Sequence, residues 1–341
     1  MVSPNPGPLT GGVERFCNFL SGVLSDADWE VSIIWPERDC PRSIYRLGGK
    51  PLWCSYSAAR QLRGRHTDLL ITNGFLGAGF PRRVPRIHVY HGTMVGTTIS
   101  GRAFLPFREC VRRGVGGGLA ETVSAANAAT VAVSESVVEE LRRYYRVRAD
   151  MLIPNGVDAS VFRPSDRVAA KSELGVDPGF PTALYVGRLE RAKGVDVLLP
   201  ACREAGFELL VAGPEPLPGA RYLGLLPPKQ LAVAYVAVDC VVLPTLYEAC
   251  SFVILEAMAT GVPLVTTAVG WMRSFLRGIP DYRQLITTPD VAALSDRLRW
   301  VASNDTGSLA VAARNWVSQH NSLQASSQQW LSLIEGVAGK G

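Results

Sequence analysis

One stretch decides the fold class: Leu243–Val265, which reads L-P-T-L-Y-E-A-C-S-F-V-I-L-E-A-M-A-T-G-V-P-L-V. An apolar run ends at Pro244, and a loop that carries Glu248 follows it. Helical spacing begins near Cys250 and ends at Gly261–Pro263, directly before another apolar run. A buried strand, a loop, a helix and a second buried strand form a βαβ unit, which predicts a parallel sheet covered by helices.

The same alternation extends in both directions from that stretch. Expected strands are the short apolar runs Val31–Trp35, Leu69–Thr72, Ile87–Tyr90, Thr130–Val133, Met151–Ile153, Ala183–Val186, Leu209–Ala212, Cys240–Leu243, Leu264–Thr267 and Leu285–Thr287. Helical stripes lie between them, for example from Phe16 to Leu24 and from Val137 to Tyr145, the latter with Ser134 as N-cap. The chain is therefore expected to be an α/β protein with parallel sheets.

The turn I-P-N-G-V-D at Ile153–Asp158 is the best candidate for a domain boundary. Asn155–Gly156 favours a turn, and Pro164 beyond it stops regular structure. The length of 341 residues also suits two domains. The limits that we expect are an N-terminal Rossmann-like domain at 1–157, a C-terminal Rossmann-like domain at 158–320 and a helical tail at 321–341. Two such sheets would face each other across a cleft, with ligands beyond the carboxyl ends of the strands.

Composition excludes several classes of protein. Apolar residues make up 47% of the chain and charged residues 19%, which argues against a disordered chain. No apolar run reaches the length that spans a bilayer, and the first residues lack the pattern of a signal peptide. The seven cysteines include no C-x-x-C pair, so neither a disulfide framework nor a zinc site is expected, and a cytoplasmic location is the default.

The charge is distributed unevenly along the chain. Residues 1–155 carry 19 Lys and Arg against 13 Asp and Glu, whereas residues 156–341 carry 16 against 17. The basic half is either an ordinary solvated surface or attracts an anionic partner, such as acidic lipid, a phosphorylated acceptor or a polymer. No nucleic-acid-binding motif accompanies the charge, so nucleic acid is not an expected partner.

Two loops of the second half can offer cations or amides to an anionic ligand. In Y-V-G-R-L-E-R-A-K-G-V, Tyr185–Val195, an expected strand runs into Gly187, and Arg188 and Lys193 follow it. Two cations five residues apart can clamp a diphosphate, or they are simply solvated charges. The backbone amides of residues 249–252, at the start of the expected helix, can meet a phosphate or a sugar.

Two loops of the first half are also candidates. Gly11–Gly12 stand directly before the first helical stripe, where glycines let a ligand approach the helix amides, although a plain loop would have the same sequence. His91 ends the expected strand I-H-V-Y, so it either faces the cleft or is satisfied by local hydrogen bonds. We interpret His88, inside that strand, as structural.

The spacing of Glu248 and Glu256 bears on their chemistry. On a continuous helix, eight residues correspond to about 80° of rotation and roughly 12 Å of rise. That exceeds the separation of about 5–9 Å in the carboxylate pair of a glycoside hydrolase. Each glutamate is therefore expected to make its own hydrogen bonds to hydroxyl groups.

Asp26-Ala-Asp28 has the D-x-D form that binds a metal-nucleotide in another class of sugar transferase. It follows an amphipathic helix in a polar turn, so we interpret it as a surface loop and expect no metal site.

Taken together, these motifs resemble the GT-B-fold retaining glycosyltransferases of family 4 (group 1). They occur in the order of that family: G-G-V-E-R, H-G, I-P-N-G-V-D, V-G-R-L-x-x-x-K-G, L-P-T-L-Y-E with the E-x7-E pair, and L-E-A-M-A-T-G-V-P-L-V. The resemblance implies a C-terminal helix that packs back on the N-terminal domain. It also implies metal-independent transfer of a hexose-type sugar, without a cofactor, from a nucleotide-diphosphate sugar, expected to carry UDP. The acceptor would be a hydroxyl of a glycan, a lipid-linked molecule or a small molecule.

The resemblance also assigns roles to residues. Arg188 and Lys193, beside Gly187, would hold the donor diphosphate, and Glu256 would bind the ribose hydroxyls. The contacts to the donor sugar would come from Glu248, Ala249, Cys250, Ser251 and Phe252. His91 would lie against the transferred sugar, and Gly12 would approach the phosphate or the acceptor. Retention would need no protein nucleophile, because the leaving phosphate helps to deprotonate the acceptor.

The sequence departs from the family pattern at four places. Met1–Ser3 are all that stands for the usual first strand, and A-G-P-E at 212–215 replaces G-D-G-P. E-A-C-S-F at 248–252 replaces E-G-F-G-L, and W-M-R-S-F-L at 271–276 replaces a G-G-x-x-E loop. These changes affect the expected contacts to the sugar more than the expected class.

Other functions remain open at this point. A sugar-nucleotide epimerase or a non-catalytic sugar-binding protein would have the same architecture. A phosphorylase of this fold would need a lysine for pyridoxal phosphate, and none of the five lysines lies in a recognisable site for it. A lipid-linked acceptor would bring the basic half to the inner face of the membrane, and Phe104–Arg113 is then the candidate anchor, unless it is an ordinary helix over the core.

Overall fold

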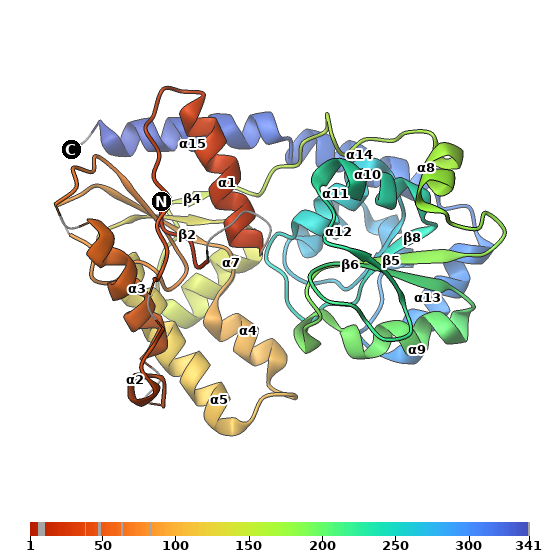
Figure 1. The fold of residues 1–341 in the computed structure, drawn as a ribbon, viewed down its shortest axis with the longest axis horizontal. Coiled ribbons are helices and arrows are strands. Elements are labelled where there is room, and N and C mark those ends of the chain that lie inside the picture. The colour runs from red at the N-terminus through yellow and green to blue at the C-terminus, as the bar shows by residue number, and fades with distance from the viewer. Residues whose placement is uncertain (6–10, 38, 47–48, 63, 82, 340–341) are drawn as a thin grey trace. The chain divides into compact units, whose positions relative to one another are not determined.

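The computed structural model describes residues 1–5, 11–37, 39–46, 49–62, 64–81 and 83–339. The chain forms two compact units (Figure 1). Unit 1 comprises Met1–Asn155 together with Gln324–Gly341, and unit 2 comprises Gly156–Leu323. These limits lie a few residues from those expected from the sequence.

Unit 1 is built on a parallel sheet of β1 Leu70–Asn73, β2 Arg86–Tyr90, β3 Ala129–Ala132 and β4 Met151–Leu152, in that order. Beyond β1, the Val2 amide donates to the carbonyl of Ile71 at 2.9 Å, and Val2 forms a parallel bridge with Ile34. Met1–Ser3 therefore occupy the place of an inner strand. The strand expected at Val31–Trp35 is a single bridge at Ile34.

Helices cover the sheet of unit 1. They are α1 Gly12–Ser25, α2 Arg42–Arg46, α3 Lys50–Ala59, α4 Met94–Gly101, α5 Phe107–Val111, α6 Gly118–Ala125 and α7 Glu135–Glu140, with the 3-10 helix η1 Arg60–Leu62 and the π-helical turns η2 Arg112–Gly117 and η3 Leu141–Tyr145. The apolar stripe of α1 is buried as expected. Ser134 caps α7 by accepting from the amide of Val137, which confirms the predicted N-cap.

The last helix, α15 Leu323–Ala338, packs on unit 1 (Figure 1). The rings of Trp330 and of Phe16 in α1 lie 5.2 Å apart, and both side chains are buried. The hydroxyl of Ser326 donates to the carbonyl of Pro154 at 3.2 Å. The expected return of the C-terminal helix to the N-terminal domain is thus confirmed.

Unit 2 has a parallel sheet in the order β7-β6-β5-β8-β9. Its strands are β5 Thr182–Val186, β6 Glu208–Ala212, β7 Arg221–Gly224, β8 Cys240–Leu243 and β9 Leu264–Thr266. The inner strands match the predicted apolar runs. The sequence does not predict β7, because R-Y-L-G lacks an apolar pattern and its side chains at the sheet edge are not fully buried. The strand expected at Leu285–Thr287 is a single bridge between Ile286 and Thr266.

The helices of unit 2 surround this sheet. They are α8 Arg167–Leu174, η4 Arg191–Lys193, α9 Val195–Ala205, α10 Pro228–Ala237, α11 Phe252–Thr260, α12 Met272–Gly278, η5 Pro280–Leu285, α13 Val291–Ser303 and α14 Gly307–His320. Helix α11 begins at Phe252, two residues after the expected start. Within the described part of the chain, no helix is both long and apolar enough to cross a membrane.

Candidate active site

The candidate site of unit 2 lies where the strand order reverses. The chain runs outward from β5 to β6 and β7, then returns to add β8 and β9 on the other side of β5. Such a switch point leaves a crevice at the carboxyl ends of the two strands, where ligands of open α/β sheets bind. Residues 187–194 follow β5, and residues 244–251 follow β8.

Close backbone contacts hold these two loops together. Gly194 has φ +71, and a methyl group on it would come within 2.1 Å of the carbonyl oxygen of Pro244. The amide of Leu246 donates to the carbonyl of Ala192 at 2.8 Å, and the hydroxyl of Thr245 donates to the same carbonyl at 3.1 Å. Only glycine permits this approach, which fixes Lys193 beside the second loop.

Lys193 and Glu248 form an ion pair across the two loops. The ammonium Nζ lies 2.5 Å from Oε1 of Glu248, and the side chains are 26% and 12% exposed. Residues singled out as separate contacts, one for a diphosphate and one for a sugar, are therefore partners in the protein without ligand. Their partial burial reduces screening by water, so the Coulomb attraction within the pair is larger than at the surface, while desolvation of both groups offsets part of that gain.

Arg188 is held more loosely. Its guanidinium lies 2.8 Å from Oε1 of Glu190, but these side chains are 56% and 43% exposed, so the pair is worth at most about 1 kcal/mol. The main chain of Arg188 is fixed, because the buried hydroxyl of Tyr185 donates to its carbonyl at 2.6 Å. The guanidinium is thus accessible from a well-held backbone.

The loop after β9 closes against Glu248. Gly270 has φ +55, and a methyl group on it would come within 1.8 Å of the carbonyl oxygen of Glu248. The amide of Trp271 donates to the carbonyl of Ala249 at 2.8 Å. The W-M-R-S-F-L segment that departs from the family pattern therefore fixes the backbone of 248–249.

Glu256 has a different partner from Glu248. It is buried in α11, and the hydroxyl of Tyr235 in α10 donates to its Oε2 at 3.0 Å. Tyr235 is also buried, and the sequence gives no signal that joins it to Glu256. The two glutamates thus have separate partners in the structure, and their separate chemical roles stay a prediction.

The second candidate cluster, in unit 1, surrounds His91. Asn73, at the end of β1, donates from Nδ2 to the carbonyl of Val2 at 2.7 Å, which fixes the orientation of its amide. Its Oδ1 lies 2.9 Å from Nε2 of His91 and can only accept, so Nε2 carries the proton. Desolvation lowers the pKa of His91 to about 3, so the ring is neutral at physiological pH. The ring is half-buried and makes an edge contact with the Phe16 ring, at 4.5 Å between centroids.

Gly11 and Gly12 differ in the room beside them. Among the described residues, a methyl group on Gly12 would meet no atom within 4 Å, whereas one on Gly11 would come within 2.6 Å of Glu14 Oε2. The side-chain amide of Asn5 donates to Glu14 Oε1 at 2.7 Å. Residues 6–10 of the predicted glycine loop lie outside the described residues, so this part of the expectation stays a prediction.

Known protein families cover both halves of the chain. A model described as Glycosyltransferase Family 4 matches residues 10–161, and one described as Glycosyl transferases group 1 matches residues 180–304. The chain belongs to the family 4, group 1 glycosyltransferases. Both candidate clusters lie inside the matched regions.

Several relatives and solved structures are similar to this family 4 glycosyltransferase. A D-inositol 3-phosphate glycosyltransferase from Segniliparus rotundus is 36% identical over 165 residues, which cover 41% of this chain and 37% of that protein. The chain spans less than half the length of the curated relatives it matches. A sucrose-phosphate synthase from Thermosynechococcus elongatus has a TM-score of 0.82 at 22% identity, covering 100% of this chain and 98% of that one. Anabaena HepE, solved with UDP and glucose, has a TM-score of 0.66 at 16% identity and 98% coverage of both chains. These two structures show the GT-B fold.

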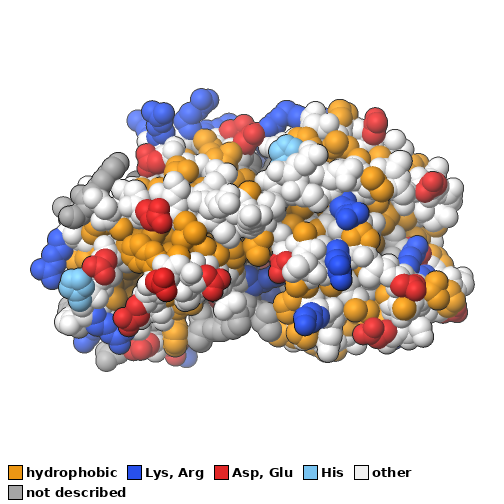
Figure 2. All heavy atoms as spheres, turned by 90° about the horizontal axis from the view of Figure 1, so that it is seen from above, with side chains coloured by type: hydrophobic (Ala, Val, Ile, Leu, Met, Phe, Trp, Pro, Cys, Tyr) orange, Lys and Arg blue, Asp and Glu red, His pale blue; other side chains and the backbone are white. Residues whose placement is uncertain are grey.

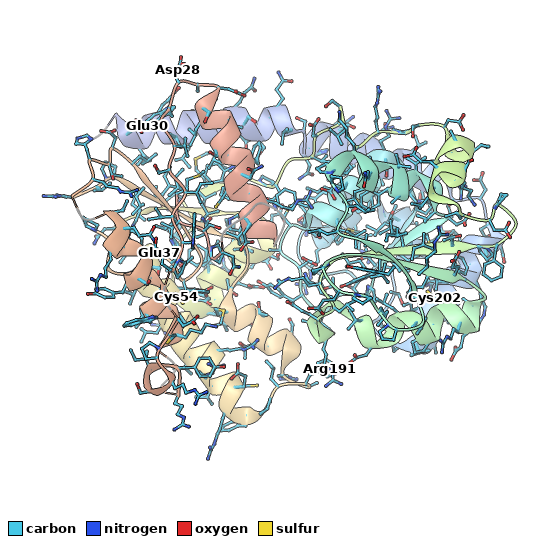
Figure 3. The ribbon with its side chains drawn as sticks, viewed as in Figure 1. Asp28, Glu30, Glu37, Cys54, Arg191 and Cys202 are labelled. Carbon is cyan, nitrogen blue, oxygen red and sulfur yellow. The ribbon has the colours of Figure 1, made fainter. Side chains whose placement is uncertain are left out.

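The D-x-D sequence takes no part in either cluster of the glycosyltransferase. Asp26 caps the C-terminus of α1, and Asp28 has φ 62 in an exposed turn (Figure 3). Among the described residues, no group of three or more His, Cys, Asp and Glu could hold a metal ion.

Proposed function

We propose that the protein is a retaining glycosyltransferase that moves a hexose-type sugar from a nucleotide-diphosphate sugar to an acceptor hydroxyl. The observation that carries the proposal is the placement of Arg188, Lys193 and Glu248 at the β5–β8 switch point, two cations and a carboxylate on loops locked together by glycine. A crevice of this kind suits a ligand that is anionic at one end and rich in hydroxyls at the other.

The diphosphate would take Lys193 from Glu248. Both compete for the same ammonium group, which lies 2.5 Å from the carboxylate. Arg188, from its exposed position, would add a second charged hydrogen bond to the diphosphate. Glu248, once released, would accept hydrogen bonds from hydroxyls of the donor sugar. We expect UDP as the nucleotide; the complex of HepE with UDP and glucose supports this choice by fold alone.

The nucleoside would be read by Glu256. A carboxylate has two acceptor oxygens, so in this proposal it accepts from the two vicinal ribose hydroxyls as well as from the hydroxyl of Tyr235. In this proposal Tyr235 is a positioning residue: it holds the carboxylate at a fixed angle inside the unit.

The transfer needs no protein nucleophile. The bond from the anomeric carbon to the diphosphate oxygen breaks, a bond to the acceptor oxygen forms on the same face, and the acceptor proton passes to the leaving phosphate. Arg188 and Lys193, with the start of α11, would offset the charge that develops on the leaving group, so no metal is required. A neutral His91 would contact the sugar without adding charge.

The acceptor would be recognised by unit 1, whose larger segment carries most of the positive charge. Its candidates are a hydroxyl of a small phosphorylated polyol, a glycan or a lipid-linked molecule. The relative from Segniliparus rotundus, named for inositol 3-phosphate, favours a phosphorylated acceptor. On the face in Figure 2, Lys and Arg side chains are interspersed with acidic ones, so the charge is not gathered in one patch there. A lipid-linked acceptor would further require peripheral contact of unit 1 with an anionic membrane.

Transfer and donor binding test this proposal together. The protein should release UDP from a UDP-sugar in the presence of an acceptor, with the anomeric configuration of the product retained by NMR. Screening of UDP-, GDP- and TDP-sugars identifies the nucleotide. Arg191→Ala is the matched control. In the sequence Arg191 lies between Arg188 and Lys193, and its exposed side chain pairs with Asp196 (Figure 3). Donor binding without transfer or hydrolysis would favour a non-catalytic sugar-binding protein, and an altered nucleotide sugar would favour an epimerase.

A further inference from the structure

An apolar face is exposed along one continuous helical segment of unit 1. The segment consists of α5, η2 and α6, from Phe107 to Ala125. Between 45% and 82% of the surface of five apolar residues is exposed: Phe107, Val111, Val115, Leu119 and Val123. From residue 111 to residue 125 the exposed residues are Val111, Val115, Leu119 and Val123, all of them apolar.

The five residues recur at every fourth position. In an α-helix, each step of four residues rotates the position by about 40°, so such a stripe winds slowly around the axis. The π-helical turn η2 has more residues per turn than an α-helix, so four residues there rotate by less than one full turn and offset part of the drift of about 40°. The π-helical turn therefore helps keep a straight apolar face.

The opposite side of the segment is already used for packing. Buried there are Gly117, Gly118, Ala120, Glu121, Ser124 and Ala125. A methyl group on Gly118 would come within 3.0 Å of a side-chain carbon of Val95, which shows how tightly the segment lies on α4. A soluble helix normally turns polar residues outward, and here the outward face is apolar instead, which is the mark of an interaction surface.

Basic residues accompany this face. Residues 102–119 contain four arginines, Arg102, Arg108, Arg112 and Arg113, against one glutamate, Glu109. Glu109 pairs with Arg112 and Arg113. Arg108 is exposed next to Phe107 at the start of the segment, and Arg102 is exposed at the end of α4, before the segment. A face of aliphatic and phenylalanine side chains flanked by arginines complements an interface of hydrocarbon and anionic headgroups.

We propose that the face formed by Phe107, Val111, Val115, Leu119 and Val123 docks on an anionic lipid surface. A second copy of the chain fits less well, because two such faces in contact would bring their arginines together. The inference rests on the proposed function in one respect: it names the surface through which unit 1 meets the membrane that holds a lipid-linked acceptor. The segment extends well beyond Phe104–Arg113, the anchor candidate of the sequence.

Vesicle sedimentation tests the proposal with the whole protein. The wild type should sediment with vesicles of phosphatidylcholine and phosphatidylglycerol, and much less with phosphatidylcholine alone. Val115→Asp combined with Leu119→Asp should weaken the partition at least about tenfold, since it places two charges on the apolar face. The matched control is Val168→Asp on α8. Val168 is a valine of unit 2 that is 79% exposed and lies outside the face, so this variant should bind vesicles as the wild type does. Arg108→Gln should weaken the partition onto anionic vesicles about fivefold and leave that onto phosphatidylcholine alone unchanged.

Phe107→Ser, at the most exposed position of the face, provides a second variant whose fold is least at risk. UDP titration of each variant by calorimetry separates the two proposals, because UDP binding should be the same in all of them. Loss of vesicle binding with intact UDP binding supports the surface. A wild type that ignores anionic vesicles, or variants that bind them unchanged, overturn it. If light scattering shows that the wild type is a dimer and that the Asp variant is a monomer, the face would be assigned to contact with a second copy. Vesicle binding without UDP binding would refute the donor site and leave this surface standing.

Discussion

The ion pair between Lys193 and Glu248 leads to an unusual expectation: removing the carboxylate should strengthen the binding of free UDP. In the protein without ligand, the ammonium of Lys193 is held by Glu248 at 2.5 Å, and the diphosphate must displace that partner. Glu248→Gln keeps the size of the side chain and removes its charge. Lys193 is then available to the diphosphate without the cost of breaking the pair.

The size of the effect follows from the burial of the pair. A charged hydrogen bond is worth about 1.5–3 kcal/mol and an exposed ion pair less than about 1 kcal/mol. With side chains 26% and 12% exposed, the pair lies between these limits. We therefore expect a gain of about 1–2 kcal/mol, or roughly 5- to 30-fold in the Kd of UDP. Glu190→Gln, which frees Arg188 from a more exposed pair, is the matched control and should gain much less.

Calorimetric titration with UDP and with uridine measures the effect. Uridine should bind equally to the wild type and to Glu248→Gln, because it lacks the diphosphate. Lys193→Ala should weaken UDP binding by about 1.5–3 kcal/mol, and adding Glu248→Gln to that variant should change nothing further. UDP that binds Glu248→Gln no better than the wild type would refute the competition. A gain that persists without Lys193 would refute it as well, since the gain would then come from another source.

The remaining predictions concern single groups. Arg188→Ala should weaken UDP binding by about 1.5–3 kcal/mol and uridine binding much less, and equal losses for both would remove Arg188 from the diphosphate. Glu256→Gln should raise the KM for the donor, and this increase should be smaller with a 2′,3′-dideoxy donor. An equal increase in KM for both donors would place the ribose elsewhere. Transfer should survive EDTA, whereas restoration of lost activity by Mn²⁺ or Mg²⁺ would return attention to Asp26 and Asp28. Burial raises the pKa of Glu121 to about 8, so the folded state keeps a proton that the unfolded state has lost above about pH 4.5. Its contribution to stability should therefore fall as pH rises from about 4.5 to 8, and the difference in Tm between the wild type and Glu121→Gln should change over that range; a constant difference would contradict this.

The sequence predicts every strand of the two described sheets except β7, and it predicts too long a strand at Val31–Trp35 and at Leu285–Thr287. The run at 240–243 was expected as a strand and is one, because a central parallel strand is buried on both faces and reads as a continuous apolar segment. The edge strand β7 at Arg221–Gly224 carries no such signal. Ile34 lies in an apolar run typical of a strand, yet it forms only a single bridge, with Val2, because pairing depends on a distant segment that the local pattern does not describe.

For the candidate site, the sequence identifies residues but not their partners. Arg188, Lys193, Glu248 and Glu256 follow from motifs, since each motif is local. The pairing of Lys193 with Glu248 joins positions 55 residues apart and exists only because β5 and β8 are neighbours. If Glu248 contacted only the donor sugar, as the family resemblance implies, Glu248→Gln would lower kcat and leave the binding of nucleotide diphosphate nearly unchanged. The ion pair revises that expectation.

The packing of Trp330 on Phe16 has a consequence for the folding of the protein during its synthesis on the ribosome. Phe16 also touches the ring of His91, so the same aromatic cluster joins the first helix, a central strand end and the last helix. Synthesis proceeds from the N-terminus, and helix α15 leaves the ribosome only after all of unit 2 has been made. Until then Phe16 on α1 lacks its contact with Trp330. The first unit to be translated is thus the last to be completed, and its final shape waits for the other unit to be synthesised.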